Sequence, residues 1–428
     1  MYLIGFYSKK KLHKLHKFDY YKKEFKELIK IGVKVIYFYK EDNSFVLEKK
    51  NIENIKKIGV TIVEFKSETE IITYLKNLNG KIFINTFEEQ EIKLVNQIRL
   101  DLQQQTTNNP NIFLNKYLQR SIIGQKYPET IVDYRLLSMS QLVFIKEDDI
   151  KKYPYIMKPT GGIQSSGVSK IENYDDYIKS INFISNSIKQ LKEKKLTEQE
   201  ILLEEYIDGD MYTIDYYVDE EQKINLSKPV LVKLGVDYGI KDFCNVVRII
   251  SKNIEKKVDQ KKLKEFIDKT VKGGQIKNTF IHHEFKINSK GEFKTIEING
   301  RIGGYRLELY QLGYNIKLLS FPFITSHNKK LFKNNVASFV LYPKEKSIFL
   351  GYNQEIIKKI KKLKSFYRLN KVNELKGQKI GLTRDGYSKV GAIILKNRNE
   401  QEFENDLKFM EEIYFKILKT KKNLLNTI

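Results

Sequence analysis

The sequence predicts an α/β protein with an open parallel sheet at its N-terminus and a larger mixed region after it. Short apolar runs alternate with amphipathic segments of helical length, and helices placed between consecutive strands favour parallel pairing. The chain has 428 residues, and single hydrophobic cores stop growing beyond roughly 250–300 residues. We therefore expect two to four domains.

Residues 1–112 show the alternating pattern most clearly. The segment SETEIITYLKNLNG is predicted to be a helix with Ser67 as its cap and Gly80 as its stop, and another helix is predicted in YYKKEFKELIKIG (20–32). The NNP motif at 108–110 marks a boundary, after which NIFLNKYLQRSII begins a further helix. Strands are predicted at YLIGFY (2–7), VKVIYFY (33–39) and KIFINTF (81–87).

From residue 154 the pattern changes, and further strands and helices are predicted. EILLEEYI (200–207) and MYTIDYYVD (211–219) are predicted to be strands joined by the tight turn DGD, and the turn NSKGE (288–292) is predicted to join a hairpin. Helices are predicted at 173–195, with Asn173 as cap, at 260–273 and from Glu400 to the end. Further strands are predicted at YPYIMK, VSKI, KPVLVKLGV, FCNVVRII, ASFVLYP, SIFLGY, SFYRL and SKVGAIIL.

The formal net charge of +24 raises the question of a nucleic-acid partner. Only nine of the 77 basic residues are Arg, and the lysines are spread over every segment, whereas proteins that contact bases and phosphates concentrate Arg for bidentate contacts. The runs at 9–11 and 358–364 fit solvated faces, the second on an amphipathic helix. The charge therefore favours small anionic ligands such as nucleotides over nucleic acid.

No apolar run reaches the 18 or more residues of a spanning helix, and the opening MYLIGFY fits a buried strand better than a signal peptide. Cys244 is the single cysteine, which excludes an internal disulfide. We expect a cytoplasmic protein without membrane contacts.

The loop KPTGGIQSSGV follows a predicted strand. Glycines allow backbone N–H groups to converge on an anion, and a preceding lysine adds a charge for phosphate oxygens. The order differs from a Walker loop, in which Lys follows the glycines, and a flexible hairpin is the alternative. The residues concerned are Lys158, Gly161, Gly162, Ser165, Ser166 and Gly167.

Two further segments carry acids on predicted strands. Glu204 and Glu205 interrupt an apolar run, and they fit either an exposed edge strand or a slot in which a Glu accepts the amine of adenine. Glu284, Glu297 and Asn299 lie on the hairpin and supply the hard oxygen ligands that Mg²⁺ prefers, although such acids are often solvent-facing. His282 and His283 lack further ligands at the spacing of a transition-metal site.

Together these pieces resemble the ATP-grasp superfamily over roughly residues 1–325. IEINGRIGG is similar to the carboxylate–amine ligases of that superfamily, which include amino-acid and dipeptide ligases and carnosine-synthase-like enzymes. The resemblance implies an N-terminal domain at 1–112, a two-lobed ATP-grasp domain at 113–325 and a small C-terminal α+β domain at 326–428. The lobes would be 113–206, with the glycine loop, and 207–325, with the metal site.

The resemblance also implies roles for individual residues. Lys116 and Lys158 would hold the phosphates of ATP, with the loop at 160–168 closing over them. Glu204 would contact adenine, and the backbone of Glu205 and Ile207 would read the ring edge. The metal ligands Glu284, Glu297 and Asn299 would bind Mg²⁺, as two ions, or Mn²⁺, and Arg301 would steady an acyl-phosphate.

Other positions are less similar to the superfamily pattern. The Glu that commonly binds the ribose hydroxyls is replaced by Met211, so Asp210 is the substitute candidate. Lys233 is a further phosphate candidate and Arg306 a candidate for a substrate carboxylate, while Gly303 and Gly304 would line the acceptor pocket.

The implied function is an ATP-dependent ligase that joins a small-molecule carboxylate and an amine through an acyl-phosphate, releasing ADP and phosphate. Catalysis would rest on Lys158 and Arg301 together with the metal, and the enzyme could be a homodimer. One alternative is a purine-biosynthetic ligase acting on a phosphoribosyl amine, against which residues 1–40 show no glycine-rich turn after the first strand. Another is a nucleotide-binding regulatory protein without turnover.

Overall fold

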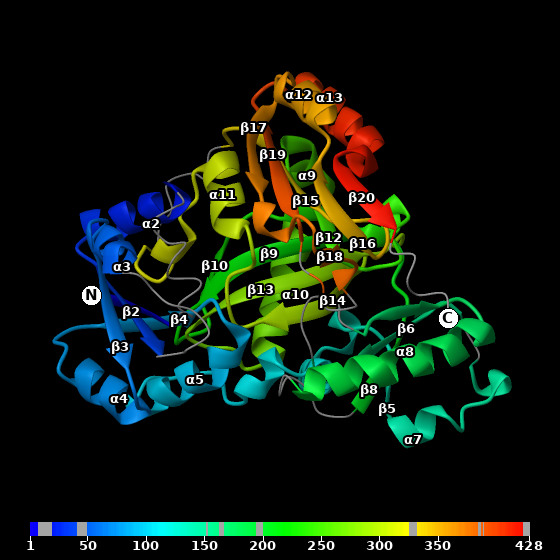
Figure 1. Ribbon diagram of the computed structural model, residues 1–428. Coiled ribbons are helices and arrows are strands. Elements are labelled where there is room, and N and C mark those ends of the chain that lie inside the picture. The colour runs from blue at the N-terminus through cyan, green and yellow to red at the C-terminus, as the bar shows by residue number, and fades with distance from the viewer. Residues whose placement is uncertain are drawn as a thin grey trace.

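A computed structural model of the chain describes residues 1–6, 19–40, 49–150, 153–161, 167–193, 200–324, 332–383, 387 and 389–422 (Figure 1). The N-terminal region, the four-stranded lobe with α8, the large central sheet and the C-terminal elements are drawn in blue, cyan to green, green to yellow and orange to red. No helix among these residues is both long and apolar enough to span a bilayer.

The N-terminal sheet has the strand order β3-β2-β1-β4, and every pairing in it is parallel, as predicted. Its strands are β1 (Tyr2–Phe6), β2 (Lys34–Lys40), β3 (Val60–Phe65) and β4 (Ile82–Thr86). Leu3, Val35 and Tyr37 pack on one face and Ile4, Ile36 and Phe38 on the other, as strand alternation requires.

The helices of this region are α2 (Asp19–Lys30), α3 (Lys49–Lys56), α4 (Glu68–Lys76) and α5 (Ile92–Asp101). The predicted cap is confirmed, since the Ser67 hydroxyl accepts the Glu70 N–H at 3.3 Å. The helix ends four residues before Gly80, at Lys76. Helix α3 and strand β3 were not predicted. Helix α3 is short and largely polar, so its sequence shows little of the apolar periodicity that indicates a helix.

The first lobe is a four-stranded antiparallel sheet in the order β5-β8-β6-β7. Its elements are β5 (Tyr134–Ser138), α7 (Met139–Leu142), β6 (Tyr155–Pro159), β7 (Ser169–Ile171), α8 (Tyr174–Glu193) and β8 (Glu200–Glu205). Asn173 caps α8 as predicted, accepting the Asp176 N–H at 2.9 Å. Met157, Ile201 and Leu203 pack beneath α8, which leaves the other face of the sheet for polar side chains.

The prediction that DGD closes a hairpin is wrong. Strand β8 belongs to the four-stranded sheet, whereas β9 (Asp210–Val218) belongs to the large sheet, so DGD carries the chain from one lobe to the other. Gly209 has φ +82°, and a Cβ there would lie 2.1 Å from the carbonyl oxygen of Ile287. A glycine is required because the turn presses on the end of another strand.

The large sheet has nine strands. Its main path is β14 (Phe293–Asn299), β13 (Thr279–Ile287), β9, β11 (Val230–Leu234), β12 (Asn245–Ile250), β15 (Asn335–Leu341), β19 (Gly391–Asn397) and β17 (Phe366–Lys371), with β10 (Ile224–Leu226) paired to β9. The antiparallel pairing of β12 with β15 continues the sheet across the expected boundary at 325/326.

The C-terminal region adds a three-stranded sheet, ordered β18 (Lys379–Ile380), β16 (Ser347–Tyr352) and β20 (Leu418–Lys422). Helix α13 (Glu400–Ile413) is followed by β20, so it does not run to the end as predicted. The remaining α-helices are α6 (Lys116–Lys126), α9 (Lys252–Lys257), α10 (Gln260–Gly273), α11 (Arg306–Tyr314) and α12 (Gln354–Lys361). Single 3₁₀ turns include η1 (Glu89–Glu91), η2 (Pro110–Phe113), η3 (Pro128–Thr130), η4 (Glu147–Asp149), η5 (Gly235–Tyr238), η6 (Leu318–Ser320), η7 (Asn373–Leu375) and η9 (Tyr414–Lys416).

The two faces of the large sheet differ near β9, β13 and β14. One face packs Ile214, Phe285 and Ile298 into the core that includes Phe266 of α10. Helix α6 packs here as well, because the Gln119 amide exchanges two hydrogen bonds with the backbone of Ile298, at 2.9 and 3.1 Å. Polar side chains therefore gather on the opposite face, which the first lobe overhangs.

Candidate nucleotide and metal site

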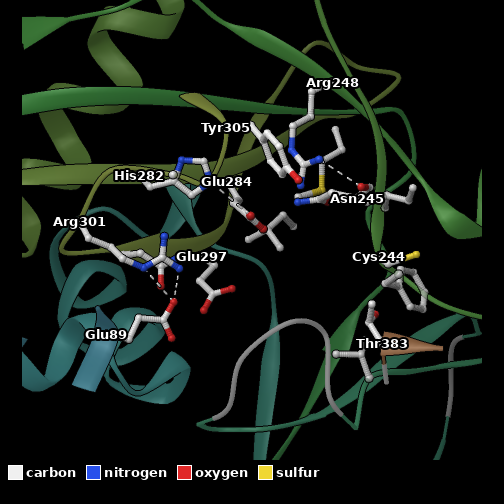
Figure 2. A pocket seen from close by; sticks show the side chains of 18 of the residues that line it. Glu89, Cys244, Asn245, Arg248, His282, Glu284, Glu297, Arg301, Tyr305 and Thr383 are labelled. Atoms are coloured by element: carbon white, nitrogen blue, oxygen red, sulfur yellow. Dashed lines mark hydrogen bonds and ion pairs between the residues drawn. The ribbon is translucent and has the colours of Figure 1, made fainter. Parts of the chain in front are cut away.

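A cavity of about 730 Å³ lies between the first lobe and the polar face of the large sheet. Figure 2 shows part of its wall, with acids and basic groups from distant segments pointing into one space. Most of the residues predicted for the site line it: Lys116, Lys158, Gly161, Glu204, Glu205, Ile207, Glu284, Glu297, Asn299, Arg301, Gly303, Gly304 and Arg306.

The first lobe contributes Lys158 and Glu204. Register pairs Ile156 with Glu204 and Lys158 with Leu202, so these side chains share the face turned away from α8. The Lys158 Nζ lies 2.7 Å from Glu204 Oε2. Arg120 of α6 holds the other oxygen, donating from Nε to Glu204 Oε1 at 3.1 Å, and it also donates to the Ile296 carbonyl at 2.7 Å.

Burial and ion pairing act in opposite directions on the pKa values of this cluster. It lowers the pKa of Lys158 to about 8, despite the opposing attraction of Glu204. Burial would raise the pKa of Glu204, but Arg120 and Lys158 together hold that pKa below its ordinary value. The carboxylate therefore stays charged, with both oxygens bound to cations, and it would position Lys158 as much as contact a base.

An apolar floor adjoins these charges. Met211, Val232 and Leu234 form a small cluster with Phe243 and Ile296 packed against it. Glu205 lines the cavity here and exchanges two hydrogen bonds with Asp133, since its carboxylate accepts the Asp133 N–H at 3.0 Å and its own N–H donates to the Asp133 carbonyl at 3.0 Å. This end of the cavity therefore offers an apolar surface beside strand backbone, which suits a planar ring.

The hairpin β13/β14 brings the predicted metal ligands together. Glu284 lies directly opposite Glu297, and His282 opposite Asn299. Glu284 is also opposite Thr213 of β9, so these side chains share the polar face. Two carboxylates and an amide on adjacent strands match the one or two carboxylates with which Mg²⁺ binds alongside water and substrate phosphates. Among the described residues no group of three or more His, Cys, Asp or Glu is placed to hold a metal.

His282 links Glu284 to the sheet. Its Nδ1 lies 3.2 Å from Asp215 Oδ1 and its Nε2 lies 3.4 Å from Glu284 Oε1. Burial would lower the pKa of His282, but the two carboxylates raise it above its ordinary value. Burial would likewise raise the pKa of Glu284, yet the hydrogen bond and charge of His282 lower it to about 2.

His283 points to the opposite face of the sheet and lies in the core. It is fully buried, and its Nε2 forms a hydrogen bond with the Thr295 hydroxyl at 3.1 Å. Burial lowers its pKa to about 3, so it is neutral.

Two more ion pairs cross the cavity. Lys116 begins helix α6 and places its Nζ 2.9 Å from Glu297 Oε1. Although burial opposes the charge, Glu297 raises the pKa of Lys116. Arg301 pairs with Glu89 of the N-terminal region, its Nε lying 3.0 Å from Oε1, as Figure 2 shows. Each basic group predicted to contact phosphate thus faces an acid.

Three predicted residues are poorly placed for the roles expected of them, and Arg306 is one of these although it lines the cavity. Asp210 is exposed, is not among the residues lining the cavity and accepts the Tyr212 hydroxyl at 3.4 Å on the other face of β9, so it is not placed to replace the ribose-binding acid. Lys233 lies in a separate groove, 3.7 Å from Glu411 Oε1. Arg306 is buried and held by Thr213 at 2.6 Å and Asp215 at 3.5 Å.

The glycine loop is described only at its ends. Gly161 and Val168 line the cavity and Gly167 has φ +75°, whereas Gly162, Ser165 and Ser166 lie outside the described residues. Residues 7–18, on which the comparison with phosphoribosyl-binding ligases depends, lie outside them too.

Sequence reasoning missed Arg120, Asp215 and Glu89. Arg120 follows Lys116 by four residues on one helix, a spacing that places both on one side and could have indicated it. Asp215 interrupts an apolar strand, as Glu204 does. Glu89 lies in a polar segment, where nothing distinguishes it from Glu88 or Glu91.

Three solved structures illustrate the likeness of the whole chain. The L-amino acid ligase from Bacillus licheniformis has a TM-score of 0.67 and 15% identity, covering 99% of this chain and 98% of that one. The N5-carboxyaminoimidazole ribonucleotide synthetase from Thermotoga maritima has a TM-score of 0.60 and 12% identity, covering 99% of each chain. The biotin carboxylase domain of 2-oxoglutarate carboxylase from Hydrogenobacter thermophilus, solved with MgADP, ADP and bicarbonate, has a TM-score of 0.59 and 12% identity, covering 98% and 91%.

At these identities the likeness concerns the fold, and it confirms the predicted fold class. A search of curated proteins found no significant match. Residues 151–308 match the family model described as an ATP-grasp domain, which agrees with the resemblance seen in the motifs. The chain therefore contains an ATP-grasp domain, set within a fold that it shares with these three proteins.

Proposed function

We propose that this protein is an ATP-dependent ligase that joins a carboxylate to an amine. The observation that supports this most is the convergence of Lys116 and Lys158 with Glu284, Glu297 and Asn299 in one cavity beside an apolar floor. Phosphate-binding cations and oxygen ligands for a metal are needed together where a phosphoryl group moves.

The nucleotide would lie across the lobes. Its base fits the floor formed around Met211 and Leu234, next to the backbone of Glu205 and Ile207, and its phosphates would reach Lys158 and Lys116. The structural neighbour solved with MgADP supports adenine nucleotide use in this fold. Binding of the nucleotide would break the ion pair between Lys116 and Glu297. Phosphate oxygens would then bind Lys116 and a metal would bind Glu297, so each residue would exchange one attractive charge interaction for another.

Glu284, Glu297 and Asn299 would hold Mg²⁺, as one or two ions, and Mn²⁺ has the same ligand preference. The metal would neutralise charge on the phosphates when bound. His282 keeps the Glu284 carboxylate ionised and oriented toward the cavity, a supporting role typical of groups that hold metal ligands.

The reaction would proceed in two steps. A carboxylate oxygen attacks the γ-phosphorus, the bond to the β–γ bridging oxygen breaks, and ADP leaves from an acyl-phosphate. The amine nitrogen then attacks the acyl carbon, the carbon–oxygen bond breaks, and phosphate leaves as the nitrogen loses a proton. Lys158 and Arg301 would stabilise the charge on the transferred group, and alignment of the reactants would supply much of the acceleration.

A second candidate is a purine-biosynthetic ligase acting on a phosphoribosyl amine. The observation that favours it is the likeness to the ribonucleotide synthetase from Thermotoga maritima over the whole chain. The acceptor would then carry a phosphate and would need a phosphate site in the N-terminal region.

The test is ADP release by the purified protein with MgATP and a matrix of carboxylates and amines, phosphoribosylamine included. Glu297→Gln should abolish ADP release with the active pair and leave the fold intact by circular dichroism. Glu265→Gln, an exposed change on α10, is the matched control and should retain the parent rate. Full activity of Glu297→Gln would refute the metal assignment, and absence of ADP release with every pair would favour the non-catalytic alternative.

A further inference from the structure

A basic and aromatic region of the cavity is not used in the proposed phosphoryl transfer. Arg248 of β12 extends into the cavity beside the ring of Tyr305, with its guanidinium carbon 5.6 Å from the ring centroid, and Figure 2 shows the two side by side. Lys389 lies over the same ring at 4.2 Å. Tyr342 also lines the cavity and lies close enough to Arg248 to affect its pKa. We call this part of the lining, formed by Arg248, Tyr305, Tyr342 and Lys389, the Arg248 end.

Arg248 differs from the other arginines of the cavity in its partners. Arg301 and Arg306, which also line the cavity, each pair with a carboxylate, as does Arg120 of α6. Within the described part of the chain, Arg248 has no carboxylate within 4.0 Å, its Nη1 donates to the Asn245 carbonyl at 3.3 Å, and its buried Nε has no hydrogen-bond partner. Arg248 is only partly exposed, and a cation removed from water without a counter-charge is costly, so an anionic ligand would stabilise it.

The surroundings of Arg248 lower the pKa of its guanidinium without neutralising it at neutral pH. Burial and the nearby guanidinium of Arg306 lower the pKa of Arg248 to about 10, while Tyr342, Tyr305 and Glu284 oppose the shift. Arg248 is therefore still protonated at neutral pH, in an environment where a carboxylate would interact strongly with it.

The Arg248 end lies apart from the metal ligands on the same face of the sheet. Register aligns Arg248 with Val232, Met211 and Lys286 across β12, β11, β9 and β13. Three strand spacings, about 14 Å between backbones, separate β12 from β13, and Glu284 lies one further alternation along β13. A small molecule could thus contact the metal ligands with one group and Arg248 with another.

We propose that the Arg248 end binds a second, non-reacting carboxylate of a substrate, so that one partner in the ligation is an amino acid or a dicarboxylate. This rests on the proposed function, and it assigns to Arg248 the role that the sequence suggested for Arg306. The planar guanidinium fork matches a carboxylate in two parallel hydrogen bonds, Lys389 adds charge, and Tyr305 holds the fork in place. Tyr342 directly follows β15 and Lys389 lies just before β19, so the C-terminal region contributes to the proposed substrate site.

The test compares free acids with their amides as ligands of the MgADP-bound protein. L-Alanine, L-phenylalanine and succinate are titrated by calorimetry against L-alaninamide, L-phenylalaninamide and succinamide. At least one acid should bind the wild type about 10- to 100-fold more tightly than its amide, the range for a charge-assisted hydrogen bond. Arg248→Met should remove that preference, and Arg248→Lys should restore part of it.

Arg398→Met, an exposed change before α13, is the control and should keep the preference. MgADP affinity is measured for each variant, and an unchanged value shows that the fold and the nucleotide site are intact. The proposal is overturned if no acid is preferred by the wild type, if Arg248→Met keeps the preference, or if Arg248→Met weakens MgADP binding instead. A wild type that prefers an acid but never releases ADP would refute the ligase while leaving the carboxylate site standing.

Discussion

The Arg120 guanidinium and the Glu204 carboxylate form a buried ion pair, with Nη2 and Oε1 3.0 Å apart and both side chains almost without solvent contact. Arg120 lies on α6, which packs against the second lobe, whereas Glu204 lies in the sheet of the first lobe. The pair therefore joins the lobes at the point where Lys158 enters the cavity. Removing Arg120 leaves Glu204 bound on one oxygen alone, by Lys158, whereas removing Glu204 takes the carboxylate from two buried cations, Arg120 and Lys158.

We expect Arg120→Met to lower the free energy of unfolding by about 3–5 kcal/mol, the range for breaking a buried pair from one side. A double-mutant cycle with Glu204→Gln should show a coupling of about 1–3 kcal/mol, because each single change already forfeits the interaction. Urea unfolding monitored by tyrosine fluorescence measures the free energy of unfolding of the wild type, the two single variants and the double variant. The exposed pair Lys364–Glu402 provides the control cycle and should show no measurable coupling. Equal coupling in the two cycles would contradict a role for Arg120 in joining the lobes.

The sequence predicted which residues form this site better than it predicted the ion pairs that they make. The spacing of Glu284, Glu297 and Asn299 on two strands sufficed to place them together, because a hairpin fixes its own register. The acids that pair with the basic residues could not be predicted, since Glu89 and Arg301 are 212 residues apart. Long-range pairing of this kind depends on how the domains pack.

In the fold, too, local features could be predicted from the sequence, whereas pairings between distant segments could not. The parallel N-terminal sheet follows from strands separated by helices, and Ser67 and Asn173 cap the helices predicted for them. The prediction for the turn DGD was wrong because a tight glycine turn has the same residue pattern whether the strands beside it pair with each other or belong to two different sheets. The pairing of β12 with β15 likewise has no local signal.

Lys158 should make nucleotide affinity depend on pH. Burial lowers its pKa to about 8, and phosphate favours the charged form, so MgADP affinity should fall between pH 7.5 and 9.5. Lys158→Arg, which stays charged, should bind with little pH dependence, and Lys158→Met should bind weakly throughout. Calorimetric titration at four pH values measures this, and a wild-type profile as flat as that of Lys158→Arg would count against a phosphate contact.

The same shift affects stability with the opposite sign. Unfolded lysine titrates near pH 10.4, so between about pH 8 and 10 the unfolded chain binds more protons at this position than the folded one. The contribution of Lys158 to the free energy of unfolding should therefore rise with pH over that interval. Comparing the urea midpoints of the wild type and Lys158→Met across the interval isolates it, and parallel curves would contradict the burial of a charged Lys158.

His282 should control the metal through Glu284. Its Nε2 lies 3.4 Å from Glu284 Oε1, and loss of a group that supports a metal ligand typically costs about 10- to 100-fold in metal affinity. We expect His282→Gln to weaken Mn²⁺ binding in the presence of ADP by about 10-fold, measured by electron paramagnetic resonance. His283→Phe changes the next residue, whose side chain lies on the opposite face among Phe266 and Phe285, and should leave Mn²⁺ affinity unchanged. Equal effects of the two changes would show that the strand, and not the imidazole, matters.

Gly303 and Gly304 are adjacent and should respond differently to the same substitution. A Cβ on Gly303 would lie 2.4 Å from His282 Nδ1 and 2.9 Å from Arg306 Cγ, whereas a Cβ on Gly304 meets nothing within 4 Å. His282 cannot yield freely, because Asp215 and Glu284 hold its two nitrogens, and the Gly303 N–H itself donates to Asp215 at 2.7 Å. Gly303→Ala should therefore lower the free energy of unfolding by about 1–3 kcal/mol, as overpacking does, and should weaken Mn²⁺ binding in the same way as His282→Gln. Gly304→Ala should unfold at the wild-type urea concentration, and a loss as large as that of Gly303→Ala would mean that the two glycines are needed for backbone freedom and not for the space beside His282.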